Sequence, residues 1–151
     1  MISTNLYETD FYAWTVEQSQ FLKAGAWENL DIINLTEEIE SLGKQQLREL
    51  EHHLGILLGH LLKWDYQSSC RNKVWQVTIR EQRREINYLL KDSPSLKPYL
   101  PEAITEAYLS GIDLALRETD LDDQDLPAVC PYTSEQIFDP NFPATLTQAR
   151  P

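Results

Sequence analysis

Apolar residues recur at steps of three and four along most of the chain, which is the spacing of one face of an α-helix. The longest such series lies in residues 34–64 and consists of Leu35, Ile39, Leu42, Leu47, Leu50, Leu54, Leu57, Leu58 and Leu61. Its last part, Leu54 to Trp64, is apolar on nearly every side, which is typical of a helix that other helices surround. We therefore expect the rest of the chain to be organised around this helix.

Three glycines stand inside this helical pattern. The apolar phase carries through Gly43, so we expect one continuous helix with a bend there; the alternative is a helix that ends at Gly43 and restarts. A glycine inside a helix costs about 1 kcal/mol relative to alanine, which tertiary packing can override. Gly55 and Gly59 lie four residues apart in the apolar part, and they predict that a neighbouring helix or a Trp ring approaches the backbone closely.

The same periodicity, together with caps and stops, predicts four further helices. They are residues 10–24, 72–91, 101–119 and 134–138. Thr9 or Asp10 can cap the first of them, and Gly25 suits its C-terminal end. Pro94 ends the second, because the residue before a proline is pushed out of the helical region.

The predicted fold class is therefore all-α: an up-and-down bundle of four main helices plus a short C-terminal helix in an extended, proline-rich tail. The tail, residues 120–151, holds five of the eight prolines. We expect it to wrap the bundle, anchored by Tyr132, Ile137, Phe138 and Phe142. We also expect residues 1–151 to form a single helical domain.

The connection between the helices over 34–64 and 72–91 is short, so these two helices should lie side by side and antiparallel. Counting outward from a pivot near Gln67 places His60 opposite Trp75 and His53 opposite Gln82.

Charge favours the same pairing. Residues 31–51 hold six acidic and two basic side chains, whereas residues 63–91 hold seven basic and three acidic ones. The register brings Glu49 and Glu51 near Arg83 and Arg84, so we expect ion pairs between the two helices.

Composition narrows the class of protein. The net charge of −11 weighs against nucleic acid as a partner, because neutralising phosphates requires a surplus of Lys and Arg. Cys70 and Cys130 lack metal-ligand spacing and suit free thiols in a reducing cytosol. The N-terminus lacks the features of a signal peptide, and the longest apolar run, Leu54 to Leu62, is shorter than the roughly 20 residues of a membrane span. We expect a cytoplasmic protein with no membrane partner.

Several segments, in order, resemble the bacterial domain of unknown function 29 family. They are YETDFYAW (Tyr7–Trp14), EEIESLG (Glu37–Gly43), HLLKW (His60–Trp64), WQVTIREQRREI (Trp75–Ile86), DSPSL (Asp92–Leu96) and CPYTSEQIFD (Cys130–Asp139). The resemblance covers nearly the whole chain and implies an all-helical, single-domain bacterial protein. It supplies no activity, ligand or catalytic residue.

His60 is the first candidate for chemistry, because burial among leucines would lower the pKa of its imidazole and suit a base or a ligand. The alternative is a core histidine that is hydrogen-bonded to a carbonyl, a carboxylate or a tyrosine. We also expect a buried polar cluster of Glu38, His60, Trp75 and Arg83, with Glu38 paired to an arginine of a neighbouring helix.

Arg48 and His53 are the second candidate. Their spacing is similar to the Arg-x(4–6)-His signature of the HEPN ribonucleases, in which the arginine binds phosphate and the histidine acts in acid–base chemistry. However, residues five apart point about 140° from each other around a helix.

No metal or cofactor is predicted. Glu49 and His52 have the Glu-x-x-His spacing of helical di-iron proteins, but those proteins need two such motifs and two further glutamates. The leading hypothesis for function is a non-enzymatic interaction module that self-associates or binds another protein. A straight helix over residues 34–64 would be about 45 Å long, and an end that projects from the bundle would suit a dimer. The rival hypothesis is a helical enzyme that uses Arg48 and His53, or His60.

Overall fold

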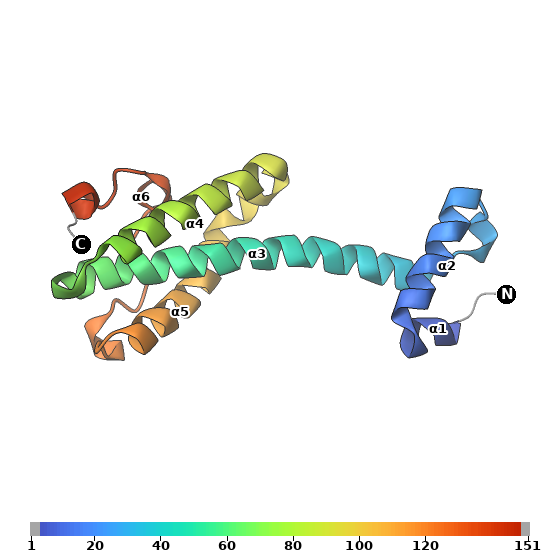
Figure 1. The fold of residues 1–151 in the computed structure, drawn as a ribbon, viewed down its shortest axis with the longest axis horizontal. Helices are drawn as coiled ribbons and strands as arrows, with labels where there is room; N and C mark the ends of the chain where they lie inside the picture. The colour runs from blue at the N-terminus through green and yellow to red at the C-terminus, as the bar shows by residue number, and fades with distance from the viewer. Residues whose placement is uncertain (1–3, 149–151) are drawn as a thin grey trace. The chain divides into compact units, whose positions relative to one another are not determined.

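The structure is a computed structural model, and it describes residues 4–148. Regular secondary structure within these residues is helical throughout, which confirms the all-α class (Figure 1). The α-helices are α1 (Thr4–Thr9), α2 (Phe11–Ala24), α3 (Ile32–Tyr66), α4 (Lys73–Asp92), α5 (Leu100–Glu118) and α6 (Ser134–Phe138). Short 3-10 helices lie at Trp27–Asn29, Ser68–Cys70, Pro94–Tyr99, Asp123–Asp125 and Ala144–Gln148.

The long central helix predicted from the apolar periodicity is α3, which is continuous through Gly43. A Cβ atom added at Gly43 would meet nothing within 4 Å. The position therefore needs no glycine, and the prediction of one uninterrupted helix is correct. Contacts divide the chain into two compact units, residues 1–45 and 46–151. The single domain over residues 1–151 stays a prediction.

In the N-terminal unit, side-chain hydrogen bonds at helix ends hold the elements together. Asp10 caps α2 by accepting from the backbone N–H of Ala13 (3.1 Å), and Gly25 ends it with a left-handed φ of 69°. Asp31, directly before α3, accepts from the indole N–H of the buried Trp14 (3.0 Å) and from the amide of Asn34 (2.8 Å). Capping and aromatic packing thus work together, as expected for short helices that are stabilised by docking.

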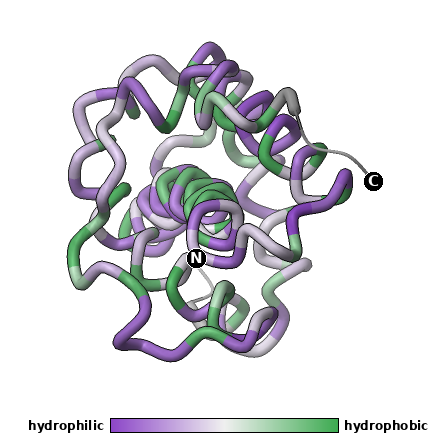
Figure 2. Tube along the Cα trace, turned by 90° about the vertical axis from the view of Figure 1, so that its left-hand side faces the viewer, coloured by the Kyte–Doolittle hydropathy of each residue, from purple (hydrophilic) through white to green (hydrophobic). Residues whose placement is uncertain are grey.

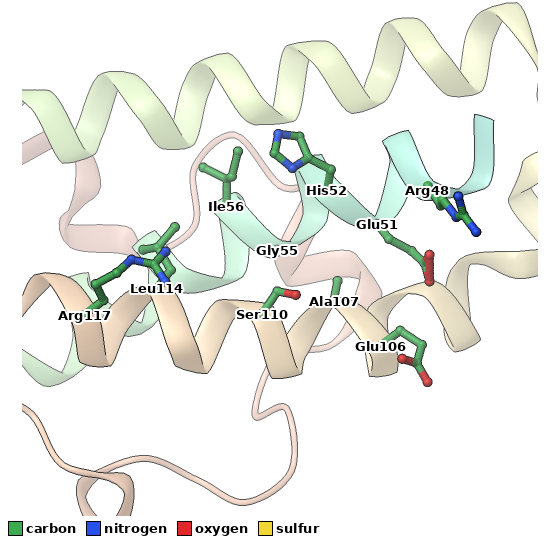
Figure 3. A pocket seen from close by; sticks show the side chains of 10 residues that line it. All are labelled: Arg48, Glu51, His52, Gly55, Ile56, Glu106, Ala107, Ser110, Leu114 and Arg117. Carbon is green, nitrogen blue, oxygen red and sulfur yellow. The ribbon is translucent and has the colours of Figure 1, made fainter. Parts of the chain in front are cut away.

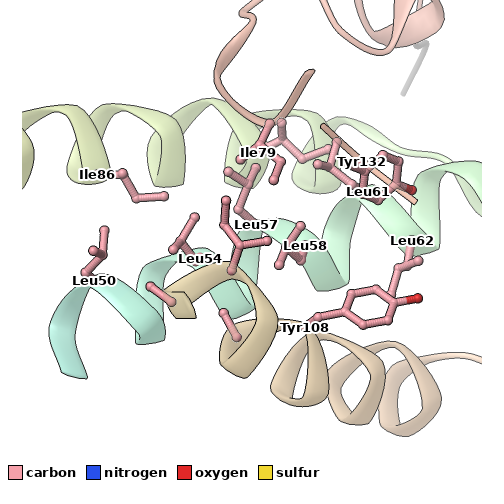
Figure 4. Packing of buried hydrophobic residues seen from close by; sticks show 14 of the residues in the cluster. Leu50, Leu54, Leu57, Leu58, Leu61, Leu62, Ile79, Ile86, Tyr108 and Tyr132 are labelled. Atoms are coloured by element: carbon pink, nitrogen blue, oxygen red, sulfur yellow. The ribbon is translucent and has the colours of Figure 1, made fainter. Parts of the chain in front are cut away.

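In the second unit, the apolar part of α3 forms the centre of the core. Its leucines at 50, 54, 57, 58, 61 and 62 are fully buried. Ile79 and Ile86 of α4, Tyr108 of α5 and Ile137 of α6 belong to the same cluster (Figure 4). In Figure 2, the turns of the long helix seen end-on carry both hydrophobic and hydrophilic residues. The predicted buried half of the helix is confirmed.

The helix α5 crosses α3 at a contact between glycines. An added Cβ at Gly59 would lie 3.1 Å from the carbonyl oxygen of Gly111, and one at Gly111 would lie 3.0 Å from the backbone nitrogen of Gly59. A Cβ at Gly55 would meet Ser110 of α5 at 3.2 Å. The close approach predicted for Gly55 and Gly59 is therefore confirmed, and the partner is α5.

The predicted register of the α3–α4 pair holds at its middle, where His53 Nδ1 and Gln82 Oε1 are 2.7 Å apart. The predicted ion pairs are wrong: among the described side chains, neither Glu49 nor Glu51 forms an ion pair with Arg83 or Arg84. The physical reason is that Arg83 is in phase with the buried face of α4 and is only 5% exposed, so it cannot reach the solvent-facing glutamates.

The described part of the tail, residues 120–148, packs against this unit, and polar side chains hold it there; residues 149–151 of the predicted wrapping tail lie outside the described residues. The Tyr132 hydroxyl donates to Asp65 (2.6 Å), the Trp64 indole N–H to Thr145 (3.0 Å), and the Tyr108 hydroxyl to the Pro127 carbonyl (2.6 Å). All four predicted anchors lie in the core cluster or against it: Tyr132, Ile137, Phe138 and Phe142.

Candidate functional site

His60 lies in the core, 7% exposed, and its Nδ1 is 2.9 Å from the carbonyl oxygen of Ile56. This geometry requires the proton on Nδ1, since only an N–H can donate to a carbonyl. Burial lowers the pKa of His60, and nearby Lys63 adds to the effect, against the opposing pull of the Ile56 bond and Glu118. His60 is thus arranged as a core histidine whose Nδ1 is hydrogen-bonded to a backbone carbonyl.

Beside His60 lies an ion pair between a buried lysine and an exposed glutamate, which the sequence did not predict. Lys63 is 2% exposed, and its ammonium donates to Glu118 of α5 at 2.7 Å while lying 4.6 Å from the ring centre of Trp75. The hydrogen bond from Lys63 lowers the pKa of Glu118. A lysine inside an apolar run predicts a buried charge, and a buried charge needs a partner of opposite charge. Helical periodicity cannot show which carboxylate supplies it.

Of the expected cluster of Glu38, His60, Trp75 and Arg83, only His60 and Trp75 share a neighbour, which is Lys63. Glu38 belongs to the N-terminal unit, where it accepts from the Tyr7 hydroxyl (2.5 Å) and raises the pKa of that phenol to about 12. The expected pairing of Glu38 with an arginine is therefore corrected: its partner is a tyrosine, brought into reach by the helices at the start of the chain.

Arg83 is bound to the tail. Its Nε donates to the carbonyl of Ile137 (2.7 Å) and its Nη2 to that of Gln136 (3.1 Å), whereas its buried Nη1 has no hydrogen-bond partner among the described atoms. Burial lowers the pKa of Arg83 to about 10, and Asp139 opposes that effect. The guanidinium remains charged at neutral pH.

Arg48 and His53 do not come together. His53 contacts Gln82 of α4, whereas Arg48 lines a groove of about 400 Å³ between α3 and α5. The histidine that shares this groove is His52, four residues from Arg48 and so on the same helix face. The groove is lined by Arg48, Glu51, His52, Gly55, Ile56, Glu106, Ala107, Ser110, Leu114 and Arg117 (Figure 3).

Arg48 lies at one end of the groove and Arg117 at the other (Figure 3). Two cationic side chains, an imidazole and the Ser110 hydroxyl could hold an anion and move a proton. Glu51 and Glu106 line the same groove and oppose an anion there. The groove thus has mixed charge, which fits a polar or zwitterionic group better than a polyanion.

The N-terminal unit carries most of the large apolar side chains that are exposed. They are Phe11, Tyr12, Val16, Leu22, Trp27, Ile32, Ile33, Ile39 and Leu42. Ile32, Ile39 and Leu42, with the half-buried Leu35 between them, follow steps of three and four and so form one stripe along α3. We call these four residues the apolar stripe. Ile39 precedes the buried Leu50 by about three helical turns, so the stripe continues the phase of the core-facing side.

Among the described residues, no group of three or more His, Cys, Asp or Glu side chains is placed to hold a metal ion. A search of the same residues finds no helix with the length and apolarity needed to cross a membrane. The described residues thus form an all-helical protein with a groove of mixed charge between α3 and α5 and an exposed apolar stripe on α3.

The chain belongs to the family described as domain of unknown function DUF29, which matches residues 6–143. This confirms the resemblance drawn from the sequence motifs. No curated protein and no solved structure matches the chain.

Proposed function

We propose that this protein is a non-enzymatic, cytoplasmic interaction module, and that the apolar stripe of α3 is its docking surface. The observation that carries the proposal is the exposure of Ile32, Ile39 and Leu42, each more than half exposed on one helix face. Exposed apolar side chains that form a patch on one face commonly mark a site of protein association. The two free cysteines suit the reducing cytosol.

Charge indicates the kind of partner. Residues 1–45 contain eight acidic and two basic side chains, a net charge of −6. Around α3, Glu38 and Glu40 lie on either side of the apolar stripe, about 80° and 120° from its centre. Like charges facing each other across an interface are unfavourable, so a second copy is a poor occupant. An amphipathic helix with an apolar face and basic flanks complements the stripe in both respects.

The test uses two synthetic helical peptides with the same leucine face, one flanked by lysines and the other by glutamates. We expect the lysine peptide to bind in a fluorescence anisotropy titration, more weakly as salt is added, and the glutamate peptide not to bind. The triple variant Ile32→Ser, Ile39→Ser, Leu42→Ser should weaken binding at least tenfold, since each buried aliphatic side chain contributes about 1.5–3 kcal/mol.

A matched control replaces three exposed apolar residues outside this unit: Val74→Ser, Leu109→Ser, Val129→Ser. This variant should bind the lysine peptide like the wild type. Equal binding of both peptides, or equal loss in the control variant, would contradict the proposal. If light scattering shows a dimer that only the stripe substitutions dissociate, the occupant of the apolar stripe is a second copy of the chain and not a basic partner.

An enzymatic function is the second candidate, and one observation favours it: Arg48, His52 and Arg117 share a groove. A phosphodiesterase would place its acid–base group at His52 rather than at His53. Ribonuclease assays of the wild type, His52→Ala and His53→Ala separate the candidates. The interaction module predicts background activity in all three proteins. Activity that only His52→Ala abolishes would establish the enzyme.

A further inference from the structure

A second pocket, of about 450 Å³, lies between α4 and the tail. It is lined by Gln76, Arg80, Arg83, Arg84, Asn87, Tyr88, Pro140 and Leu146. The six residues from α4 follow helical spacing along one side of that helix. Three of them are arginines and none of the lining residues is acidic, in a chain whose net charge is −11. This is a local concentration of positive charge that the overall composition does not predict.

Arg83 links the pocket to the interior. It is nine-tenths or more buried, and no described carboxylate lies within 4.0 Å of it to form an ion pair. Two of its nitrogens donate to the carbonyls of Gln136 and Ile137, but Nη1 has no partner. Nη1 has almost no accessible surface, so an anion in the pocket cannot reach it. The guanidinium of Arg83 instead contributes its positive charge to the pocket, because no ion pair with a described carboxylate neutralises it.

The chemistry of the acceptor follows from its surroundings. Arginine forks match the planar or trigonal oxygens of carboxylate and phosphate groups. Tyr88, Pro140 and Leu146 supply apolar surface on which a ring or aliphatic chain can lie. The volume is within the roughly 300–1,000 Å³ typical of small-molecule sites. We propose that this pocket binds a small organic anion. Its phosphate or carboxylate group contacts Arg80 and Arg84, next to the charge of Arg83, and its apolar body packs on Tyr88, Pro140 and Leu146.

The tail would take part in such binding, because Arg83 also holds the tail carbonyls and Gln76 donates to the carbonyl of Leu146 (2.8 Å). An anion that binds the arginines therefore also contacts the tail, which Arg83 and Gln76 hold in place. We expect bound ligand to slow amide hydrogen exchange in residues 136–146 as well as in α4. This site lies wholly within residues 46–151, and its test is independent of the peptide experiment on the apolar stripe.

The probes are 1-naphthyl phosphate, 1-naphthoate and the neutral 1-naphthamide, titrated into the full chain by calorimetry. We expect one or both anions to bind, and the amide to bind at least about tenfold more weakly, because it cannot form charge-assisted hydrogen bonds. Binding of the phosphate alone would assign a phosphate headgroup. Binding of both anions would show that a single carboxylate suffices.

Two exposed arginines supply the decisive variant. Arg80→Gln, Arg84→Gln should lower the affinity for the anion by roughly tenfold or more. Lys73→Gln, Lys91→Gln makes the same change in charge on the same helix outside the pocket, and should leave the affinity unchanged because distant exposed charges are screened.

The inference is overturned if neither anion binds, or if the amide binds as tightly as the anions. It is equally overturned if Lys73→Gln, Lys91→Gln weakens binding as much as Arg80→Gln, Arg84→Gln. In that last case the attraction is a property of the whole helix and not of the pocket.

Discussion

Replacement of Gly111 by alanine would place a methyl group between α5 and α3. The added Cβ would lie 3.0 Å from the backbone nitrogen of Gly59, 3.1 Å from the Cβ of Leu58 and 3.3 Å from the carbonyl oxygen of Gly55. Two of these three atoms belong to the backbone of α3, so the contact can be relieved only by moving one helix away from the other.

Overpacking of this kind costs about 1–3 kcal/mol, and alanine regains about 1 kcal/mol of helix propensity over glycine. The net expectation for Gly111→Ala is a loss of about 0–2 kcal/mol in the free energy of unfolding. Gly43→Ala is the control, because an added Cβ there meets nothing within 4 Å. It should stabilise the protein by about 1 kcal/mol.

Urea denaturation followed by circular dichroism measures both free energies. Hydrogen exchange then locates the change, in residues 100–118 for Gly111→Ala and in residues 35–50 for Gly43→Ala. The same substitution should thus have opposite signs at two helical glycines. If Gly111→Ala stabilises the protein as much as Gly43→Ala does, the close crossing of α3 and α5 is wrong.

Three further predictions concern buried polar groups. The pKa of His60 is lowered in the folded protein, so as pH falls the unfolded chain takes up a proton at this imidazole before the folded protein does. The free energy of unfolding should therefore fall as pH drops below 6.5, and His60→Leu should flatten this slope. Asp31→Ala leaves a buried indole donor unpaired and should lower the free energy of unfolding by about 1–3 kcal/mol. Asp10→Ala, at the exposed cap of α2, should lower it by about 1 kcal/mol. Hydrogen exchange of residues 11–24 should detect both losses. The hydrogen bond from Lys63 lowers the pKa of Glu118 in the folded protein. The free energy of unfolding should therefore also fall as pH drops below 4.5. Glu118→Gln should remove this part of the pH dependence in urea titrations.

Within the candidate sites, the sequence was informative where residues lie close along one helix. Arg48 and His52 are four residues apart, a spacing that predicts one shared face, whereas the Arg48–His53 pair followed a motif whose spacing turns the side chains apart. The excess of basic side chains over residues 63–91 is visible in the sequence. The pocket that three of them line is not, because its other wall is the tail, some 50 residues further along the chain.

The sequence by itself determined each of the described α-helices except α1, the cap at Asp10, the stop at Gly25, the buried half of α3 and the close approach at Gly55 and Gly59. These features depend on local periodicity and on turn chemistry, which short stretches of sequence encode. A short connection likewise determined the register that brings His53 to Gln82.

Only the tertiary structure decided which polar groups meet across long separations. Lys63 with Glu118, Arg83 with the tail carbonyls, and Trp64 with Thr145 are each brought together by the crossing of α5 or by the path of the tail. A helix presents a different side chain about every 100°, so a small rotation of one helix against another changes every such partner. That rotation is set by packing of the whole core, which no single stretch of sequence contains.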